Sequence, residues 1–327
     1  MLRPVADDPA ALAADPAALA HTLVDAINAL SGRHAGFRAA HAKGVLCEGT
    51  FTPSDAASGL TRAAHMQGDP VRVTVRFSNG SGDPGAPDND RRDGRGMAIK
   101  FYLPEGGTTD IVAITIPVFF VRTPEDFLGF TGARVPDPET GQPDMEKIGA
   151  FVAEHPETGA ALQLILPSLV APRSYATCQY NSLHAFRFVN AEGDGRFARY
   201  RIDPEAGVET MPDDELESAS PDYLQDDIHE RLERGPVGFR LLARLAEEGD
   251  PLDDPTAAWP DERKTVELGR IELTGPDTTR ETGDDVLVFD PTRMTDGIEL
   301  SDDPILAVRS WAYSASVERR SGVPRPA

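Results

Sequence analysis

The stretch Val71-Arg-Val-Thr-Val-Arg-Phe-Ser78 alternates apolar and polar residues without interruption. Its three valines and Phe77 fall on one face of an extended chain, because successive side chains of a strand point to opposite sides. This period of two predicts a strand with one face in a core. A long Gly-, Asp- and Pro-rich loop, Asn79 to Gly96, separates it from the next apolar segment. A loop of this length inside a compact domain is more often functional than idle.

Further strand-like and helix-like segments lie on both sides of this strand. The expected strands are Gly44–Thr52, Met97–Leu103, Ile111–Val121, His184–Asn190, Arg196–Ile202, Val237–Leu245 and Val266–Leu273, of which Val237–Leu245 also fits a short helix. Helices are expected over Leu19–Leu30, within Thr123–Leu164 and over Pro304–Arg320, and the acidic stretch Pro204–His229 is expected to be a solvated loop region. Many strands with helices segregated between them predict one α+β domain built on an antiparallel sheet or barrel.

The expected last helix carries the clearest chemical pattern. Asp302 or Asp303 can cap it, and Pro304 suits its first turn. At about 100° per residue, Arg309, Tyr313 and Arg320 lie within roughly 40° of one another. A phenol ionises at about pH 10, but a nearby cation favours the phenolate. A phenolate is a competent ligand for ferric iron. The alternative is a buried core tyrosine flanked by surface arginines.

His41 stands in Phe37-Arg-Ala-Ala-His-Ala-Lys-Gly44, directly before the first expected strand. An imidazole there can shuttle a proton at neutral pH, although a structural histidine is the simpler alternative. The other histidines show no metal-ligand spacing. The loop residues Asp88, Asn89, Asp90 and Asp93 do not fit the calcium-loop pattern, so a solvated loop is expected there.

Composition limits the partners of the chain. Its 327 residues include 54 acidic and 32 basic ones, for a net charge of −22. Such a field disfavours nucleic acid and anionic membranes, so any anion must be bound by a local basic cluster. Cys47 and Cys178 lack CxxC spacing and are expected to be reduced, buried thiols. No apolar run is long enough for a membrane helix and no signal-peptide pattern begins the chain, which predicts a cytoplasmic protein.

Several separated segments together resemble the haem catalases. In chain order they are Arg38-Ala-Ala-His41-Ala-Lys-Gly44, Val75-Arg-Phe-Ser78 with Arg95-Gly-Met-Ala-Ile-Lys-Phe-Tyr102, Pro117-Val-Phe-Phe-Val-Arg122 with Phe127 and Phe130, His184-Ala-Phe-Arg-Phe-Val-Asn190, and Phe289-Asp-Pro-Thr-Arg-Met followed by Gly297-Ile-Glu and Arg309-Ser-Trp-Ala-Tyr313. Each segment alone is a weak signal. The ordered set spans roughly residues 37 to 320 and is specific.

The resemblance implies haem b inside a β-barrel, with Tyr313 as the proximal iron ligand. It implies that Arg309 holds this ligand as a phenolate, and that Arg38, Arg76 and Arg320 meet the haem propionates. On the distal side it implies an acid–base role for His41, whose tautomer Ser78 would fix. The aromatic positions it assigns to the haem or the substrate channel are Phe119, Phe127 and Phe130.

The sequence departs from the family on the distal side. Typical catalases carry Gly-Asn-Asn-Thr-Pro before the Phe-Phe pair, whereas this chain has Ala113-Ile-Thr-Ile-Pro117. The asparagine is replaced by Ile114, or by Thr115 if the alignment slips by one. An apolar wall is expected to favour bulkier, less polar hydroperoxides. The extended N-terminal arm and C-terminal helical domain of typical catalases are expected to be missing, as in the minimal catalase-related peroxidases.

We therefore expect three segments: 1–36 as lead-in and helix, 37–322 as the haem-binding core, and 323–327 as a tail. The expected function is reduction of organic hydroperoxides and hydrogen peroxide with weak catalase activity, using a small organic reductant. Two alternatives stay open: a fatty-acid hydroperoxide-rearranging enzyme of the allene oxide synthase type, and a non-catalytic haem-binding protein. The sequence also leaves the assembly open, with a homodimer as one arrangement.

Overall fold

The computed structural model describes residues 15–277 and 287–321. The expected tail, 323–327, and residues 1–14 of the expected segment 1–36 therefore lie outside the described residues. The strands are β1 (Gly44–Pro53), β2 (Val71–Asn79), β3 (Arg95–Tyr102), β4 (Thr108–Ile114), β5 (Tyr180–Asn181), β6 (Phe186–Val189), β7 (Gly195–Pro204), β8 (Val237–Leu245), β9 (Thr265–Pro276) and β10 (Ile298–Leu300). The α-helices are α2 (Pro16–Ser31), α3 (Asp55–Leu60), α4 (Pro124–Ala133), α5 (Met145–Glu154), α6 (Pro156–Ser168), α7 (Asp213–Ser218), α8 (Tyr223–Arg234) and α9 (Pro304–Arg320).

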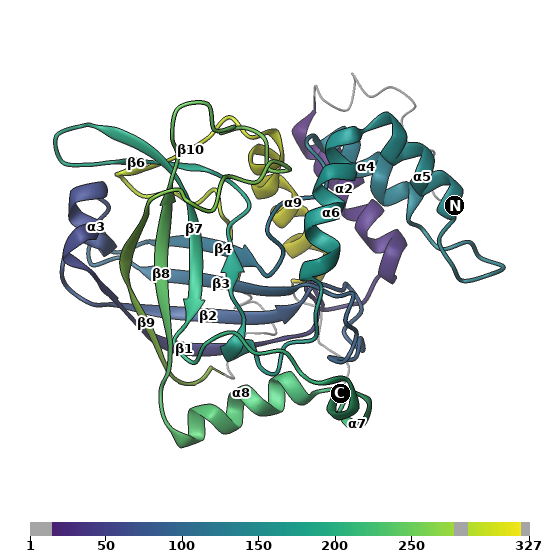
Figure 1. Ribbon diagram of the computed structural model, residues 1–327, viewed down its shortest axis with the longest axis horizontal. Coiled ribbons are helices and arrows are strands. Elements are labelled where there is room, and N and C mark those ends of the chain that lie inside the picture. Colours follow the sequence, from purple (N-terminus) through teal and green to yellow (C-terminus); the bar gives the residue numbers. More distant parts are fainter. Residues whose placement is uncertain (1–14, 278–286, 322–327) are drawn as a thin grey trace.

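Eight antiparallel strands close into a barrel. Their order is β7-β5-β4-β3-β2-β1-β9-β8, and pairing of β7 with β8 completes the ring, while β6 and β10 extend it beside β7. Helices α2, α4, α5, α6 and α9 gather beside one side of the barrel, and α8 lies along another (Figure 1). The expected α+β fold with an antiparallel β-barrel and surrounding helices is confirmed. Within the described residues, no helix has the length and apolar character needed to cross a membrane.

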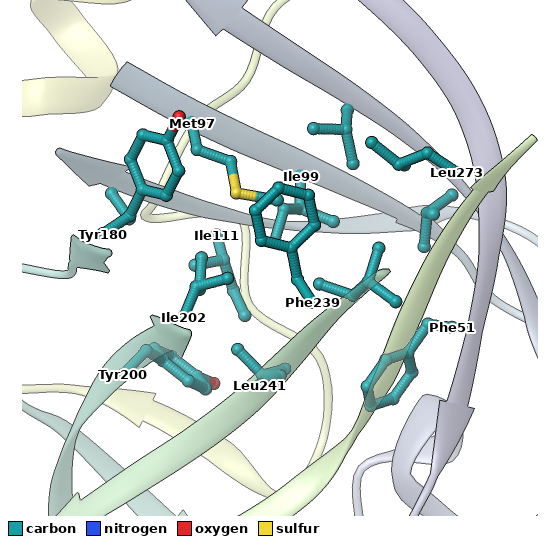
Figure 2. Packing of buried hydrophobic residues seen from close by; sticks show 14 of the residues in the cluster. Phe51, Met97, Ile99, Ile111, Tyr180, Tyr200, Ile202, Phe239, Leu241 and Leu273 are labelled. Carbon is teal, nitrogen blue, oxygen red and sulfur yellow. The ribbon is translucent and has the colours of Figure 1, made fainter. Parts of the chain in front are cut away.

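The inside of the barrel is packed with side chains. Val73, Val75 and Phe77 of β2 are completely buried in the main core. Aromatic and aliphatic residues from the other strands belong to the same core. Among them are Phe51, Met97 and Phe239, which Figure 2 labels. The alternate residues of β2, Arg76 and Ser78, point the other way and line a cavity outside the barrel. The expectation of a haem inside the barrel is therefore wrong, because apolar side chains fill that space.

Several elements differ from the sequence-based expectations. The acidic region 204–229 is not a solvated loop throughout, because α8 buries Leu224, Ile228 and Leu232 at helical spacing against the sheet. The strand expected over Ile111–Val121 already ends at Ile114. The segment Val237–Leu245, which fitted a strand or a short helix, is strand β8.

The loop between β2 and β3 is partly internal rather than solvated. Asp88 is completely buried and pairs with Lys43 at 2.8 Å. The same carboxylate accepts hydrogen bonds from the Asn79 side chain at 2.7 Å and from the backbone N–H of Leu224 at 2.8 Å. These partners explain why an aspartate is tolerated there and tie the loop to the start of α8.

Candidate active site

The candidate active site is a cavity of about 800 Å³. It lies between the outer face of β2, β3 and β4 and the helices α2, α4 and α9. This volume falls within the usual range for ligand and cofactor sites. Ten residues expected to belong to the site line it: Arg38, His41, Arg76, Ser78, Ile114, Phe119, Phe127, Arg309, Tyr313 and Arg320.

His41 stands in an unusual backbone conformation. Its φ of 56° makes it the one non-glycine residue with positive φ in the described ranges. Such a conformation costs energy for a residue with a Cβ, and it occurs mainly at turns and functional sites. The backbone is fixed there because the His41 N–H donates to Gly80 O at 3.2 Å and Arg76 donates to His41 O at 3.0 Å.

The imidazole of His41 contacts the Ser78 hydroxyl and lies close to a glycine. Its Nδ1 lies 3.0 Å from Ser78 Oγ. A Cβ on Gly96 would come within 2.8 Å of that hydroxyl and 2.9 Å of Nδ1. Burial, with smaller contributions from Arg76 and Arg309, lowers the pKa of His41 to about 4. The ring is therefore neutral at ordinary pH and can accept a proton.

Two arginines converge at the edge of the cavity near α9. Arg38 and Arg320 both donate to the carbonyl of Leu287, at 3.0 and 3.2 Å. Arg76 supplies a third guanidinium, which also binds the segment preceding β1. This cluster of cations lines a mainly apolar cavity in an otherwise acidic protein, which suits a flat apolar group with anionic substituents.

Tyr313 ends a chain of four side chains. Arg309 donates one hydrogen bond to the Tyr313 phenol oxygen and another to His184 Nε2 at 3.0 Å. His184 Nδ1 lies 2.6 Å from Asp303 Oδ2. A guanidinium only donates, so Nε2 is the acceptor and Nδ1 carries the proton that bonds Asp303. Burial lowers the pKa of His184, consistent with this neutral tautomer.

Sequence reasoning missed His184 and the full role of Asp303. His184 was recognised only as the start of a strand, although it is almost completely buried and contacts Arg309. Asp303 was considered only as a helix cap, which it is, accepting from the N–H groups of Ile305 and Leu306. The two lie 119 positions apart, so spacing could not reveal the contact.

The residues expected to line the channel divide into two groups. Ile114, Phe119 and Phe127 face the cavity. Thr115 does not line it, because its hydroxyl accepts a hydrogen bond from the N–H of Arg95 at 3.0 Å. Phe130 is buried among the aromatic side chains behind the wall and does not line the cavity either. Of the two candidates for the asparagine's place, Ile114 is the one at the cavity.

A second group of ligand-type side chains lies away from this cavity. Among the described residues, Asp126, His155 and Glu157 bring three potential ligand atoms within 4.8 Å. Asp126 and Glu157 occupy the first turns of α4 and α6, where carboxylates are favoured by the helix dipole without any ion.

Cys47 and Cys178 are free and buried, as expected, and burial raises the pKa of each thiol to about 12.

Comparison with known proteins identifies the family. A family model described as Catalase matches residues 9–325. A catalase-related peroxidase of Mycolicibacterium paratuberculosis is 43% identical over 93% of this chain and 95% of its own length. A catalase-related peroxidase of Synechococcus elongatus is 34% identical over 91% and 88%. The chain belongs to the catalase family, a family of oxidoreductases that act on peroxide.

Solved catalases share the fold described above. Catalase A of Saccharomyces cerevisiae superimposes with a TM-score of 0.78 at 26% identity, covering 89% of this chain and 62% of that chain. A fungal catalase gives the same TM-score and identity, with 60% of its chain covered. The chain thus spans about three fifths of these solved catalases.

Proposed function

We propose that the protein is a haem b peroxidase that reduces organic hydroperoxides and hydrogen peroxide and has weak catalase activity. The observation that carries this proposal is one cavity lined by a neutral His41, an arginine-bonded Tyr313 and the apolar side chain of Ile114. The first two would provide a proton acceptor and an oxygen ligand for iron. The third favours substrates with apolar substituents.

The residues present fit a haem. Tyr313 would hold the iron, and Arg38, Arg76 and Arg320 would bind the propionates. When bound, the haem supplies the two-electron chemistry that cleaves the peroxide bond. The cavity is large enough and its lining is mainly apolar, with cations concentrated at α9 and at the segment before β1.

On the distal side, His41 moves the proton. Ser78 engages Nδ1, so Nε2 is the nitrogen left to accept the hydroperoxide proton and return it to the departing alcohol or water. Its low pKa keeps the ring neutral before substrate arrives.

On the proximal side, Arg309 stabilises negative charge on the Tyr313 oxygen. His184 and Asp303 hold the guanidinium in position from behind. The geometry of the pair is thereby fixed before the cofactor binds, which lowers the cost of organising the site.

The proposal is tested with haem-loaded protein by two rates measured side by side. One is donor oxidation driven by cumene hydroperoxide, and the other is oxygen evolution from hydrogen peroxide. We expect the first to be prominent and the second weak, and His41→Ala to abolish most of both. Oxygen evolution as fast as that of a full-length catalase, or unchanged turnover in His41→Ala, would contradict the proposal.

The two alternatives predict different products. An enzyme of the allene oxide synthase type would convert a lipid hydroperoxide into a rearranged epoxide, whereas the peroxidase yields the alcohol. A non-catalytic haem-binding protein would yield neither, and it would not need a neutral histidine in a strained conformation. Action in the cytoplasm and assembly as a homodimer stay predictions, and sedimentation of the purified protein tests the second.

A further inference from the structure

Arg134 is a cation at the cavity that the proposed function does not use. It follows the last residue of α4, and its side chain lines the same cavity as His41. The residue is exposed, so this part of the lining is in contact with solvent. Its guanidinium carbon lies 5.5 Å from the centre of the Phe130 ring, which holds the side chain against α4.

Arg134 differs from the other arginines that line the cavity. Arg309 is bonded to Tyr313 and His184, and Arg92 pairs with Asp90 at 3.3 Å. The three arginines near α9 and β1 bind backbone carbonyls, as described above. Within residues 15–277 and 287–321, the Arg134 guanidinium has no hydrogen bond or ion pair, and it lies over the Phe130 ring. Its donors are free to bind an anion.

The cavity that Arg134 lines also has an apolar wall. Its residues include Ile114, Ile116, Phe119, Phe127, Ile165 and Leu169. A ligand that satisfies both features has an anionic end and a long hydrocarbon body. The net charge of −22 repels anions from the molecule as a whole. Binding an anion therefore requires a local cation that has no other partner.

We propose that Arg134 binds the carboxylate of a long-chain fatty-acid hydroperoxide whose hydrocarbon chain lies along this apolar wall. The inference rests on the proposed function, because it names the substrate class of the same cavity. A planar guanidinium matches a carboxylate with two parallel hydrogen bonds, which an ester cannot reproduce. Arg134 thus selects free acids over neutral hydroperoxides.

The test compares the hydroperoxide of linoleic acid with its methyl ester. In wild type we expect kcat/KM to be about tenfold higher for the acid, because one charge-assisted pair is worth about one decade. Arg134→Gln should remove this preference by raising KM for the acid, with kcat and the ester's constants unchanged. Arg92→Gln removes the same charge from an arginine that already has a partner, and it should keep the preference.

A third substrate separates the two proposals. Wild type and Arg134→Gln should reduce tert-butyl hydroperoxide, which has no carboxylate, at equal rates. If they do so and Arg134→Gln still prefers the acid, the inference about Arg134 is overturned while the proposed function stands. If wild type reduces no hydroperoxide, the proposed function fails. Calorimetric titration with linoleate then tests carboxylate binding by Arg134 separately. An unchanged Kd for linoleate in Arg134→Gln overturns the inference about Arg134.

Discussion

Gly96 lies so close to the His41–Ser78 pair that no side chain fits between them. A methyl group at this position would come within 3.0 Å of the histidine ring. We expect Gly96→Ala to displace the ring and to lower kcat/KM for hydroperoxides at least about tenfold, since small misplacements of catalytic groups are costly. Haem content should stay unchanged, because Gly96 is not among the residues assigned to the haem.

Gly59→Ala is the matched control for this substitution. Gly59 lies in α3, and a Cβ there has open space around it. Activity should not change, and stability should rise slightly because alanine favours a helix more than glycine does. Steady-state kinetics of both variants check the prediction. Equal activity of Gly96→Ala and wild type would show that the ring tolerates the displacement.

The pH dependence follows from the burial of His41. Its pKa is lowered from 6.5 to about 4, so the neutral form persists well below neutral pH. We expect kcat/KM for tert-butyl hydroperoxide to fall only near pH 4. The same shift costs stability below pH 6.5, because the unfolded chain then takes up a proton that the folded chain refuses. A half-maximal rate near pH 6.5 would mean that His41 is not the proton acceptor.

At the residue scale, the sequence predicted those site residues that belong to a family motif. His41, Tyr313 and the arginines were assigned through the resemblance, and all of them line the cavity. His184 and Asp303, which support Arg309, were not assigned to the site. They meet only because the fold brings distant segments together. Arg134 was also missed, since an unpaired cation can be recognised only when its surroundings are known.

At the scale of elements, α9 links stability to the site through Asp303. The carboxylate caps the helix at 2.8 Å from the Ile305 N–H and also holds His184. Asp303→Ala loses both contacts and should lower the free energy of unfolding by about 2–4 kcal/mol. Asp303→Asn keeps a capping oxygen and should lose less. Urea denaturation of both variants checks this order, and equal losses would contradict the capping role.

The helix α9 was predicted with the bounds that the structure has, because Pro304 and the preceding aspartate mark its start. The helix α8 was not predicted. Its sequence is dominated by charged residues, and the stripe of Leu224, Ile228 and Leu232 is narrow. The high content of charged residues led to the prediction of a solvated loop. The segment is a helix instead, because its apolar stripe is buried against β9.

At the scale of the whole molecule, the packed barrel core supports the strands that line the site. Phe77 is completely buried, and its ring stacks on Tyr175 with centres 5.4 Å apart. Phe77→Ala should lower the free energy of unfolding by about 3–5 kcal/mol. Leu166 is 63% exposed, and Leu166→Ala should change stability by less than about 0.5 kcal/mol. Thermal denaturation compares them, and similar losses would mean that the barrel core contributes little.

The alternation of β2 predicted which residues face the core, but it did not predict on which side of the barrel a ligand lies. Both faces of β2 are largely buried, one by the barrel core and one by the cavity and its covering segments. Closure through β7 and β8 joins strands with no turn signal between them, since α7 and α8 intervene. Such long-range pairing is set by the packing of the whole chain rather than by local pattern.

The central claim is that a haem iron is held by Tyr313 in this cavity, and the visible spectrum of purified protein tests it most directly. Wild type should show a Soret band with high-spin ferric features of a phenolate ligand, and Tyr313→Phe should lose those features. A spectrum that is the same in both proteins would contradict the account. So would a wild-type protein that is colourless and cannot be reconstituted with haem.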